Sequence, residues 1–206
     1  MPGNIWRYPG DTVELERNPR NINGRQVLSL RHSNIFGEQR EYIAFRGNEL
    51  TYVGFEDEEG IGGVFFDPPV VIGDDRMSVG KSYTTHANFV MRDHPEMSGY
   101  IDETFSVVAR ENVRLYGETS GFGNCFKLRE DFSGHSSGGP EGDVNDSGFA
   151  YHWYCPNVGQ VQLEVDGQRV GLFGGNISTP QALNPGRVVY LSPVANKVVS
   201  MLRNRK

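Results

Sequence analysis

Acid–base catalysis is the first chemistry to consider, because the chain contains five histidines and an imidazole titrates near neutral pH. None of them forms an H-x-H or H-E-x-x-H pair, so their spacing predicts no histidine metal centre. His86 and His152 both fall in segments predicted as strands. With an acidic neighbour they would do the proton transfers of a small β-barrel hydrolase or cyclase. The competing interpretation of His152 is a hydrogen-bonded core histidine.

A second candidate chemistry is calcium binding. Oxygen-bearing side chains stand at the first, third and fifth positions of one polar segment, namely Asp143, Asn145 and Ser147. Gly148 follows at the sixth position, as calcium loops require. Position twelve is Tyr154 where such a loop has a bidentate Glu, so a calcium site here needs a remote carboxylate. The alternative is a solvated loop, and the sequence predicts no other cofactor.

Two cysteines, Cys125 and Cys155, lie thirty residues apart, each within a predicted strand. If the two strands are neighbours, a disulfide is geometrically feasible. Two unpaired thiols buried as small apolar side chains are the alternative. The sequence by itself leaves both open.

Composition excludes several function classes. A chain of 206 residues can bury roughly 70% of its unfolded surface, so it can form a stable hydrophobic core without needing disulfides or metal ions. Its net charge of −6 repels a phosphate backbone, which argues against nucleic acid as a partner. No apolar run approaches the roughly 18 residues of a membrane-spanning helix. The first ten residues lack the features of an export signal, so we expect a cytoplasmic protein or a domain whose signal was removed.

The elements that would position these residues are β-strands joined by tight turns. Asp166-Gly167 is typical of a type I′ turn, and it would pair Val165 with Gln168 and Leu163 with Val170. Asn23-Gly24 and Gly47-Asn48 predict two earlier hairpins of the same kind.

Longer strands are expected over 82–91 and 100–110, and shorter ones over 113–116 and 125–130. Within 100–110 the alternation is clear, because Ile101, Glu103 and Phe105 alternate with mostly polar neighbours. Closely spaced strands without helical periodicity predict an all-β fold, an antiparallel meander forming one curved sheet, an open barrel or a sandwich. We expect this domain to span 1–175.

Two segments depart from the strand pattern. Residues 131–148 are dominated by Gly, Ser and Asp, which predicts a mobile excursion between two strands. Residues 176–206 become irregular and then predict a short helix, with Ser192 as N-cap and Pro193 in its first turn. Such a tail would pack on its own domain or on a partner, including a second copy of the chain.

Three motifs resemble a poorly characterised group of exported bacterial β-proteins. They are Gly3-Asn4-Ile5-Trp6-Arg7-Tyr8, Val79-Gly80-Lys81-Ser82-Tyr83, and Phe126-Lys127-Leu128 followed by Trp153-Tyr154-Cys155-Pro156-Asn157-Val158-Gly159-Gln160-Val161. At fold level the group is similar to the half-barrels of periplasmic lipoprotein carriers. The resemblance implies a periplasmic or extracellular location, in which a Cys125–Cys155 disulfide would form.

These observations together favour a non-catalytic binding or assembly protein of the cell envelope or extracellular space. Its apolar concave face would hold an apolar small molecule or another protein subunit. The aromatic side chains expected to line that face are Trp6, Tyr83, Phe105, Tyr151 and Trp153. The alternatives are a structural subunit of an extracellular assembly that uses its C-terminal tail, and the hydrolase or cyclase considered above.

Overall fold

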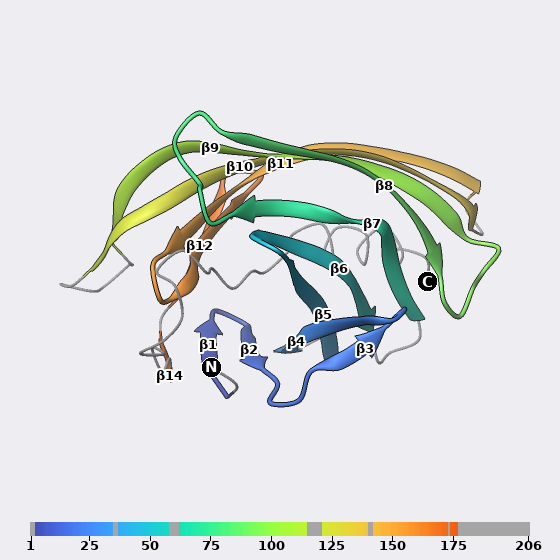
Figure 1. The fold of residues 1–206 in the computed structure, drawn as a ribbon, viewed down its shortest axis with the longest axis horizontal. Coiled ribbons are helices and arrows are strands. Elements are labelled where there is room, and N and C mark those ends of the chain that lie inside the picture. Colours follow the sequence, from blue (N-terminus) through green and yellow to red (C-terminus); the bar gives the residue numbers. More distant parts are fainter. Residues whose placement is uncertain are drawn as a thin grey trace.

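A computed structural model describes residues 3–34, 37–57, 62–114, 121–139, 142–172 and 174–176. This part of the chain is all-β and contains no helix (Figure 1). The first seven strands are β1 (Ile5–Tyr8), β2 (Asp11–Leu15), β3 (Arg20–Ile22), β4 (Arg25–Asn34), β5 (Gly37–Arg46), β6 (Glu49–Asp57) and β7 (Gly62–Asp74). The others are β8 (Ser82–Met91), β9 (Ser98–Arg114), β10 (Gly121–Gly139), β11 (Gly142–Cys155), β12 (Gly159–Val165), β13 (Gln168–Gly171) and β14 (Gly174–Asn176).

The strands form one antiparallel meander, as the sequence predicts. Along the sheet the order is β13-β12-β11-β10-β9-β8-β7-β6-β5-β4-β2-β1-β14, and β3 pairs with β4 beside this path. Figure 1 shows that the sheet curves until β1 and β12 approach each other, which makes a nearly closed barrel. The tail that would carry the predicted helix, residues 177–206, lies outside the described residues.

All three predicted hairpins are confirmed. At the first and third turns both central residues have positive φ, 50° and 78° at Asn23-Gly24 and 51° and 75° at Asp166-Gly167. Val165 pairs with Gln168, and Leu163 with Val170, in the predicted register. The turn chemistry therefore set the register of these strands.

The prediction of a mobile excursion over 131–148 is wrong. Residues 131–139 and 142–148 belong to β10 and β11, which pair from Phe126 opposite Tyr154 to Gly139 opposite Gly142. The Gly, Ser and Asp content of this segment was a poor guide to its structure, because strands pair through backbone hydrogen bonds rather than through apolar side chains. On its other edge β10 pairs with β9, so its polar stretch is held on both sides.

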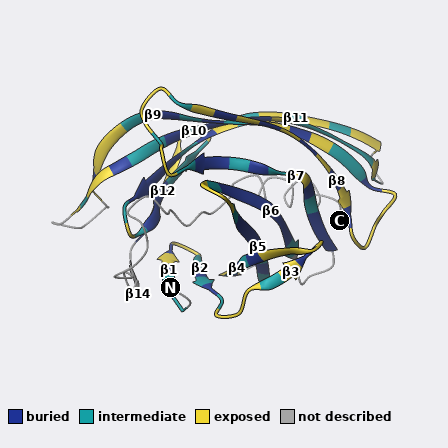
Figure 2. Cartoon of the chain, viewed as in Figure 1, coloured by how far each residue is buried: buried dark blue, intermediate teal, exposed yellow. Residues whose placement is uncertain are grey.

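The inner face of the barrel is the hydrophobic core. Along β8 every second residue is buried, from Tyr83 to Met91, and the residues between them are exposed (Figure 2). One large buried cluster joins residues from β1 to β12, including Trp6, Phe105 and Val161. Alternation thus gives the sheet an apolar inner face. A second, smaller buried cluster is separate from it and consists of Ile22, Val27, Tyr42, Ala44 and Val53, with Phe65 packed against them.

The barrel closes through side chains at the approach of β1 to β12, which we call the seam. The Trp6 indole Nε1 donates to the carbonyl of Val158 at 2.6 Å, and the Tyr8 hydroxyl donates to the carbonyl of Gln160 at 2.6 Å. Burial, with the nearby Asp11 carboxylate, raises the pKa of Tyr8, so its hydroxyl remains a donor. No ladder joins β1 to β12 in the described part of the chain.

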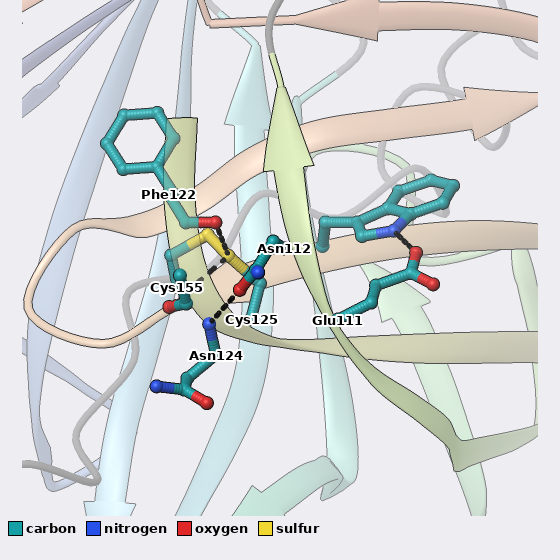
Figure 3. Close-up of a disulfide and its surroundings, with 8 residues drawn as sticks. Glu111, Asn112, Phe122, Asn124, Cys125 and Cys155 are labelled. Carbon is teal, nitrogen blue, oxygen red and sulfur yellow. Dashed lines mark hydrogen bonds between the residues drawn. A yellow bond between two sulfur atoms is a disulfide. The ribbon is translucent and has the colours of Figure 1, made fainter. Parts of the chain in front are cut away.

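A disulfide joins Cys125 on β10 to Cys155 at the end of β11 (Figure 3). Both cysteines are buried in the core. The main chain turns sharply beside it, at Asn124, whose φ is 57° and whose amide donates to the Asn112 side chain at 3.1 Å. Of the two possibilities left open by the sequence, the structure shows the disulfide.

Replacing Cys125 and Cys155 together by Ser should lower the free energy of unfolding by about 3 kcal/mol, because the bond closes a loop that the unfolded chain would otherwise sample freely. Urea unfolding of the oxidised, reduced and doubly substituted proteins measures this. The reduced wild type should match the double variant. Equal stability of all three would contradict the structural role of this bond.

Candidate functional site

The inner face carries a chain of three polar side chains on neighbouring strands. Glu103 of β9, Glu130 of β10 and His152 of β11 each occupy a position where the strand's apolar residues point inward. Glu103 is 2% exposed, and Glu130 and His152 are 0% exposed. We call this set the acid–imidazole chain.

The three groups contact one another directly. His152 Nε2 lies 2.7 Å from Glu130 Oε2, and the Glu130 carboxyl is hydrogen-bonded to that of Glu103. Burial, followed by the charge of Glu130, raises the pKa of Glu103 well above its ordinary value. Two touching carboxyl groups need a proton between them, so Glu103 is the carboxylic acid that donates to Glu130.

His152 is the neutral end of this chain. Burial lowers its pKa to about 3, against smaller opposing effects of a hydrogen bond with Gln160 and the charge of Glu41. A neutral imidazole can donate its Nε2 hydrogen to Glu130, which then accepts from both neighbours. The Tyr154 ring stacks on the imidazole at 5.9 Å, and its hydroxyl donates to Gln160 at 3.0 Å.

A second polar cluster lies on the facing part of the barrel wall. His32 of β4 places Nδ1 at 2.8 Å from Asp11 Oδ2 and Nε2 at 3.5 Å from Glu41 Oε2. Burial would lower the pKa of His32, but the Glu41 charge and the bonds to Asp11 and Glu41 outweigh it and raise this pKa to about 10. His32 is therefore a buried imidazolium held by two carboxyl groups.

The two clusters are linked electrostatically, because the charge of Glu41 acts on His152 as well as on His32. The interior thus contains a carboxylic acid, a neutral imidazole and an imidazolium within one apolar environment. These groups can donate and accept protons or hydrogen bonds at low dielectric. No group of three His, Cys, Asp or Glu in the described residues has the geometry of a metal site.

The aromatic side chains predicted to line the concave face divide between both faces. Trp6, Tyr83 and Phe105 belong to the inner face, where Tyr83 lies opposite Phe105 in the β8–β9 ladder. Tyr151 and Trp153 flank His152 and so lie on the other face of β11. Trp153 is nevertheless 2% exposed and belongs to the large buried cluster, against which the half-buried Tyr151 packs. Lys127 Nζ lies 4.3 Å from the Tyr151 ring centre and 4.8 Å from that of Trp153.

Tyr83 also belongs to a polar contact at the end of its strand. Its hydroxyl donates to Asp74 Oδ1 at 2.8 Å, and the Lys81 ammonium lies 5.0 Å from its ring centre and pairs with Asp74. Burial, followed by the hydrogen bond to Asp74, raises the pKa of Tyr83 to about 12. Trp153, in turn, donates from Nε1 to Glu111 Oε1 at 2.5 Å (Figure 3).

The residues predicted for calcium lie in the extended strand β11 rather than in a loop. Asp143, Asn145 and Ser147 are alternate residues of that strand, and Asn145 Oδ1 is 3.1 Å from His135 Nδ1. A calcium loop wraps its ligands around the ion, which an extended strand does not do.

His86 and His152 cannot act at one site. His86 is exposed on the outer face, where its Nδ1 lies 2.7 Å from Asp102 Oδ1, whereas His152 is buried inside. A pair formed by an imidazole and a carboxyl group does exist inside the barrel, with Glu130 as the acid. The hypothesis of acid–base chemistry therefore rests on His152 alone of the two histidines.

Sequence analysis missed most of the interior polar residues. Glu103 and Glu130 each interrupt an apolar alternation, between Ile101 and Phe105 and between Leu128 and Phe132. A charged residue in the apolar phase of a strand is the signal that could have found both. Their mutual contact, in contrast, depends on the register between β9 and β10.

An open hollow of about 360 Å³ lies on the outer surface between β2, β3 and β4. Four of its charged side chains form ion pairs, Arg31 with Glu14 at 2.5 Å and Arg20 with Glu16 at 3.3 Å, and Arg17 also lines it. Exposed pairs of this kind contribute little to stability. The interior clusters remain the stronger candidate site.

Comparison with known proteins gives no assignment. No protein-family model, no curated protein and no solved structure matches this chain. Among the described residues there is also no helix of the length and apolar character needed to cross a membrane. The class that fold and site define is thus an all-β barrel with a buried acid–imidazole chain.

Two substitutions within the acid–imidazole chain test which of its two carboxyl groups holds the proton. Glu103→Gln keeps a donor toward Glu130 and should cost about 1 kcal/mol or less of the free energy of unfolding. Glu130→Met removes the central acceptor and leaves two buried donors without it, which should cost about 3 kcal/mol or more. Urea unfolding at pH 7 measures both. Equal costs would show that Glu103 is not the protonated member.

The two buried histidines should make stability depend on pH in opposite directions. His152, whose pKa is lowered to about 3, contributes stability that is lost as pH falls from about 6.5 toward 3. His32, whose pKa is raised to about 10, contributes stability that is lost as pH rises from about 6.5 toward 10.

Urea unfolding between pH 4.5 and 9, with NMR of the imidazole nitrogens, checks both statements. His152→Gln should flatten the acid side of the profile, and His32→Gln the alkaline side. A protonated His152 at pH 5 or a neutral His32 at pH 8 would contradict the assignment.

Proposed function

We propose that this protein is a non-catalytic binding protein of the cell envelope or extracellular space, and that its barrel takes up an amphipathic small molecule. The apolar part of the ligand would lie against the inner aromatic side chains. Its polar group would bind the acid–imidazole chain. The proposal places the ligand on the same face as Trp6, Tyr83 and Phe105.

The observation that carries this proposal is the full burial of the acid–imidazole chain on a face that, apart from it and the His32 cluster, is mostly apolar. Buried polar and charged groups are costly to fold, and apolar residues of similar volume are often as stable or more so. If the three residues of the acid–imidazole chain served only the core, Leu or Met could replace them. Recognition of a polar group explains why these residues stand there.

The protonation pattern indicates the chemistry of the ligand's polar group. Glu103 donates its hydroxyl hydrogen to Glu130, so the two acids offer a ligand acceptor oxygens rather than a further donor. A ligand hydroxyl group can donate to such an oxygen, which an ether cannot do. A long-chain alcohol is therefore the simplest ligand of the proposed class.

The seam supplies a route for entry. Backbone ladders hold the other junctions of the barrel wall, whereas the hydrogen bonds of Trp6 and Tyr8 bridge β1 and β12. β14 pairs with β1 and follows β13 closely in the chain, so opening the seam requires β1 and β14 to move together away from β12. The ligand would reach the inner face between β1 and β12.

The disulfide supports the proposed location. Disulfides persist in oxidising compartments and are rare in the cytosol, and Cys125–Cys155 joins two core strands of this barrel. The motifs shared with exported β-proteins point the same way.

Titration of the solvent-extracted protein with 1-decanol, followed by calorimetry and tryptophan fluorescence, tests the proposed function. We expect saturable binding of one molecule, and binding of 1-methoxydecane about tenfold weaker, because the ether cannot donate to Glu130. Phe149→Ala, on the outer face, should leave both affinities unchanged. Equal affinity for alcohol and ether, or no binding of either, would refute the proposal.

A matched variant tests the route of entry. Tyr8→Phe keeps the ring and removes one hydrogen bond of the seam, so it should accelerate uptake of 1-decanol in stopped-flow fluorescence with little change in equilibrium affinity. Ile101→Val, a core change away from the seam, is the control. Unchanged uptake in Tyr8→Phe would rule out the seam as the route.

A second candidate function is acid–base catalysis, favoured by one specific observation. Glu103 is a carboxylic acid and His152 a neutral imidazole, and both contact Glu130, so a proton donor and a proton acceptor share one buried chain. An isomerisation or cyclisation needs only such proton transfers. Conversion of a bound ligand that is lost in His152→Gln while binding persists would favour this function over simple carriage.

A further inference from the structure

We propose that the outer face of β8–β11 is a binding site for a neutral polysaccharide, centred on three side-chain rings. This site is independent of the barrel interior, because its residues alternate with the inward-facing ones along the same strands. The rings belong to His86 of β8, Tyr100 of β9 and His135 of β10. We call them the ring platform.

The three rings lie side by side across three strands. The centre of the Tyr100 ring is 5.4 Å from that of His86 and 5.9 Å from that of His135, with interplanar angles of 36° and 32°. Tyr100 is 38% exposed, an unusual position for a large aromatic side chain on a polar face. The platform thus offers a surface on which the C–H face of a sugar ring can stack.

Planar polar groups hold both ends of the platform. His86 Nδ1 lies 2.7 Å from Asp102 Oδ1, and His135 Nδ1 lies 3.1 Å from Asn145 Oδ1. Each contact orients an imidazole and keeps a carboxylate or amide beside the rings. Side chains of this kind bind pairs of sugar hydroxyls, and their geometry is set before any ligand arrives.

Short hydroxyl side chains extend the polar surface along the same two strands. Thr84 and Thr104 are hydrogen-bonded across β8 and β9 at 3.0 Å, and Ser82 and Ser106 at 2.9 Å. Such side chains lose little conformational entropy when they bind. The face therefore continues beyond the platform, as binding of a polymer requires.

Charge selects among the possible polymers. Around the platform, residues 82–91, 98–106 and the described part of 131–149 contain no Lys or Arg, whereas Asp102 and Asp146 lie among them. The cations of the same strands stand further along: Arg129, which pairs with Asp131 at 2.6 Å, Lys127 and Arg110. A phosphate backbone or an acidic polysaccharide would be repelled. Val90, Val108 and Phe149 are also exposed on these strands, but they occupy separate positions on three strands and form no single apolar centre of the kind that a protein interface needs. A neutral glycan is the polymer that this chemistry fits.

Affinity electrophoresis of the full chain in native gels containing xylan, glucomannan, hydroxyethyl cellulose or dextran tests the proposal. We expect retardation by at least one of these polymers. Tyr100→Ala should weaken the binding about tenfold, since ring stacking contributes on the order of 1 kcal/mol. Asp102→Ala should weaken it as well, through the lost hydroxyl contacts.

Phe149→Ala removes another exposed aromatic side chain of the outer face, outside the platform, and is the matched control. Thermal unfolding should show Tyr100→Ala and Phe149→Ala to be comparably folded. The proposal is overturned by migration unaffected by all four polymers, or by equal retardation of wild type and Tyr100→Ala. Tyr100-dependent binding of oligo(dT) or of a proline-rich peptide, without glycan binding, would equally overturn it.

Discussion

The structure depends on the burial of one face of a single curved sheet. Because neighbouring side chains on a strand point to opposite faces, every strand that joins the meander must keep its apolar residues in one phase. β8 does so over its whole length, from Tyr83 to Met91. The curvature then brings the apolar faces of distant strands together, and the seam between β1 and β12 completes the enclosure.

Within this constraint the acid–imidazole chain is the exception that defines the candidate site. Glu103 and Glu130 occupy inward positions, so their carboxyl groups are buried together and must share a proton. His152 stays neutral in the same environment, whereas His32, beside two carboxyl groups, is protonated. The same residue type therefore holds opposite charge states inside one barrel, and the difference comes from the neighbours of each imidazole.

The alternation that buries this chain also builds the outer face. Tyr100 points outward because it precedes the buried Ile101, and Phe149 points outward because it precedes the buried Ala150. The long strands β8–β11 thus carry two separate surfaces, one enclosed and acidic, the other exposed and rich in hydroxyl groups. Binding at one surface does not depend on binding at the other, since the two surfaces are opposite faces of the same sheet (Figure 2).

Local sequence signals determined the strand content and several registers. Asp166-Gly167 and Asn23-Gly24 specify turns in which both residues take positive φ, and the alternation over 82–91 identifies β8 to the residue. Such features depend on neighbours in the chain, so sequence patterns report them. The ordered strand over 131–139 was not predictable in this way, because it relies on backbone bonds to β9 and β11.

Only the tertiary structure decided which residues meet. The sequence permitted both a disulfide and two free thiols, and the pairing of β10 with β11 brought Cys125 to Cys155. Likewise the contact of Glu103 with Glu130, and the effect of Glu41 on His152, arise from strand register and from curvature of the sheet. Local sequence patterns predict on which face of its strand each side chain lies. They do not predict which distant strand that side chain meets once the sheet has closed.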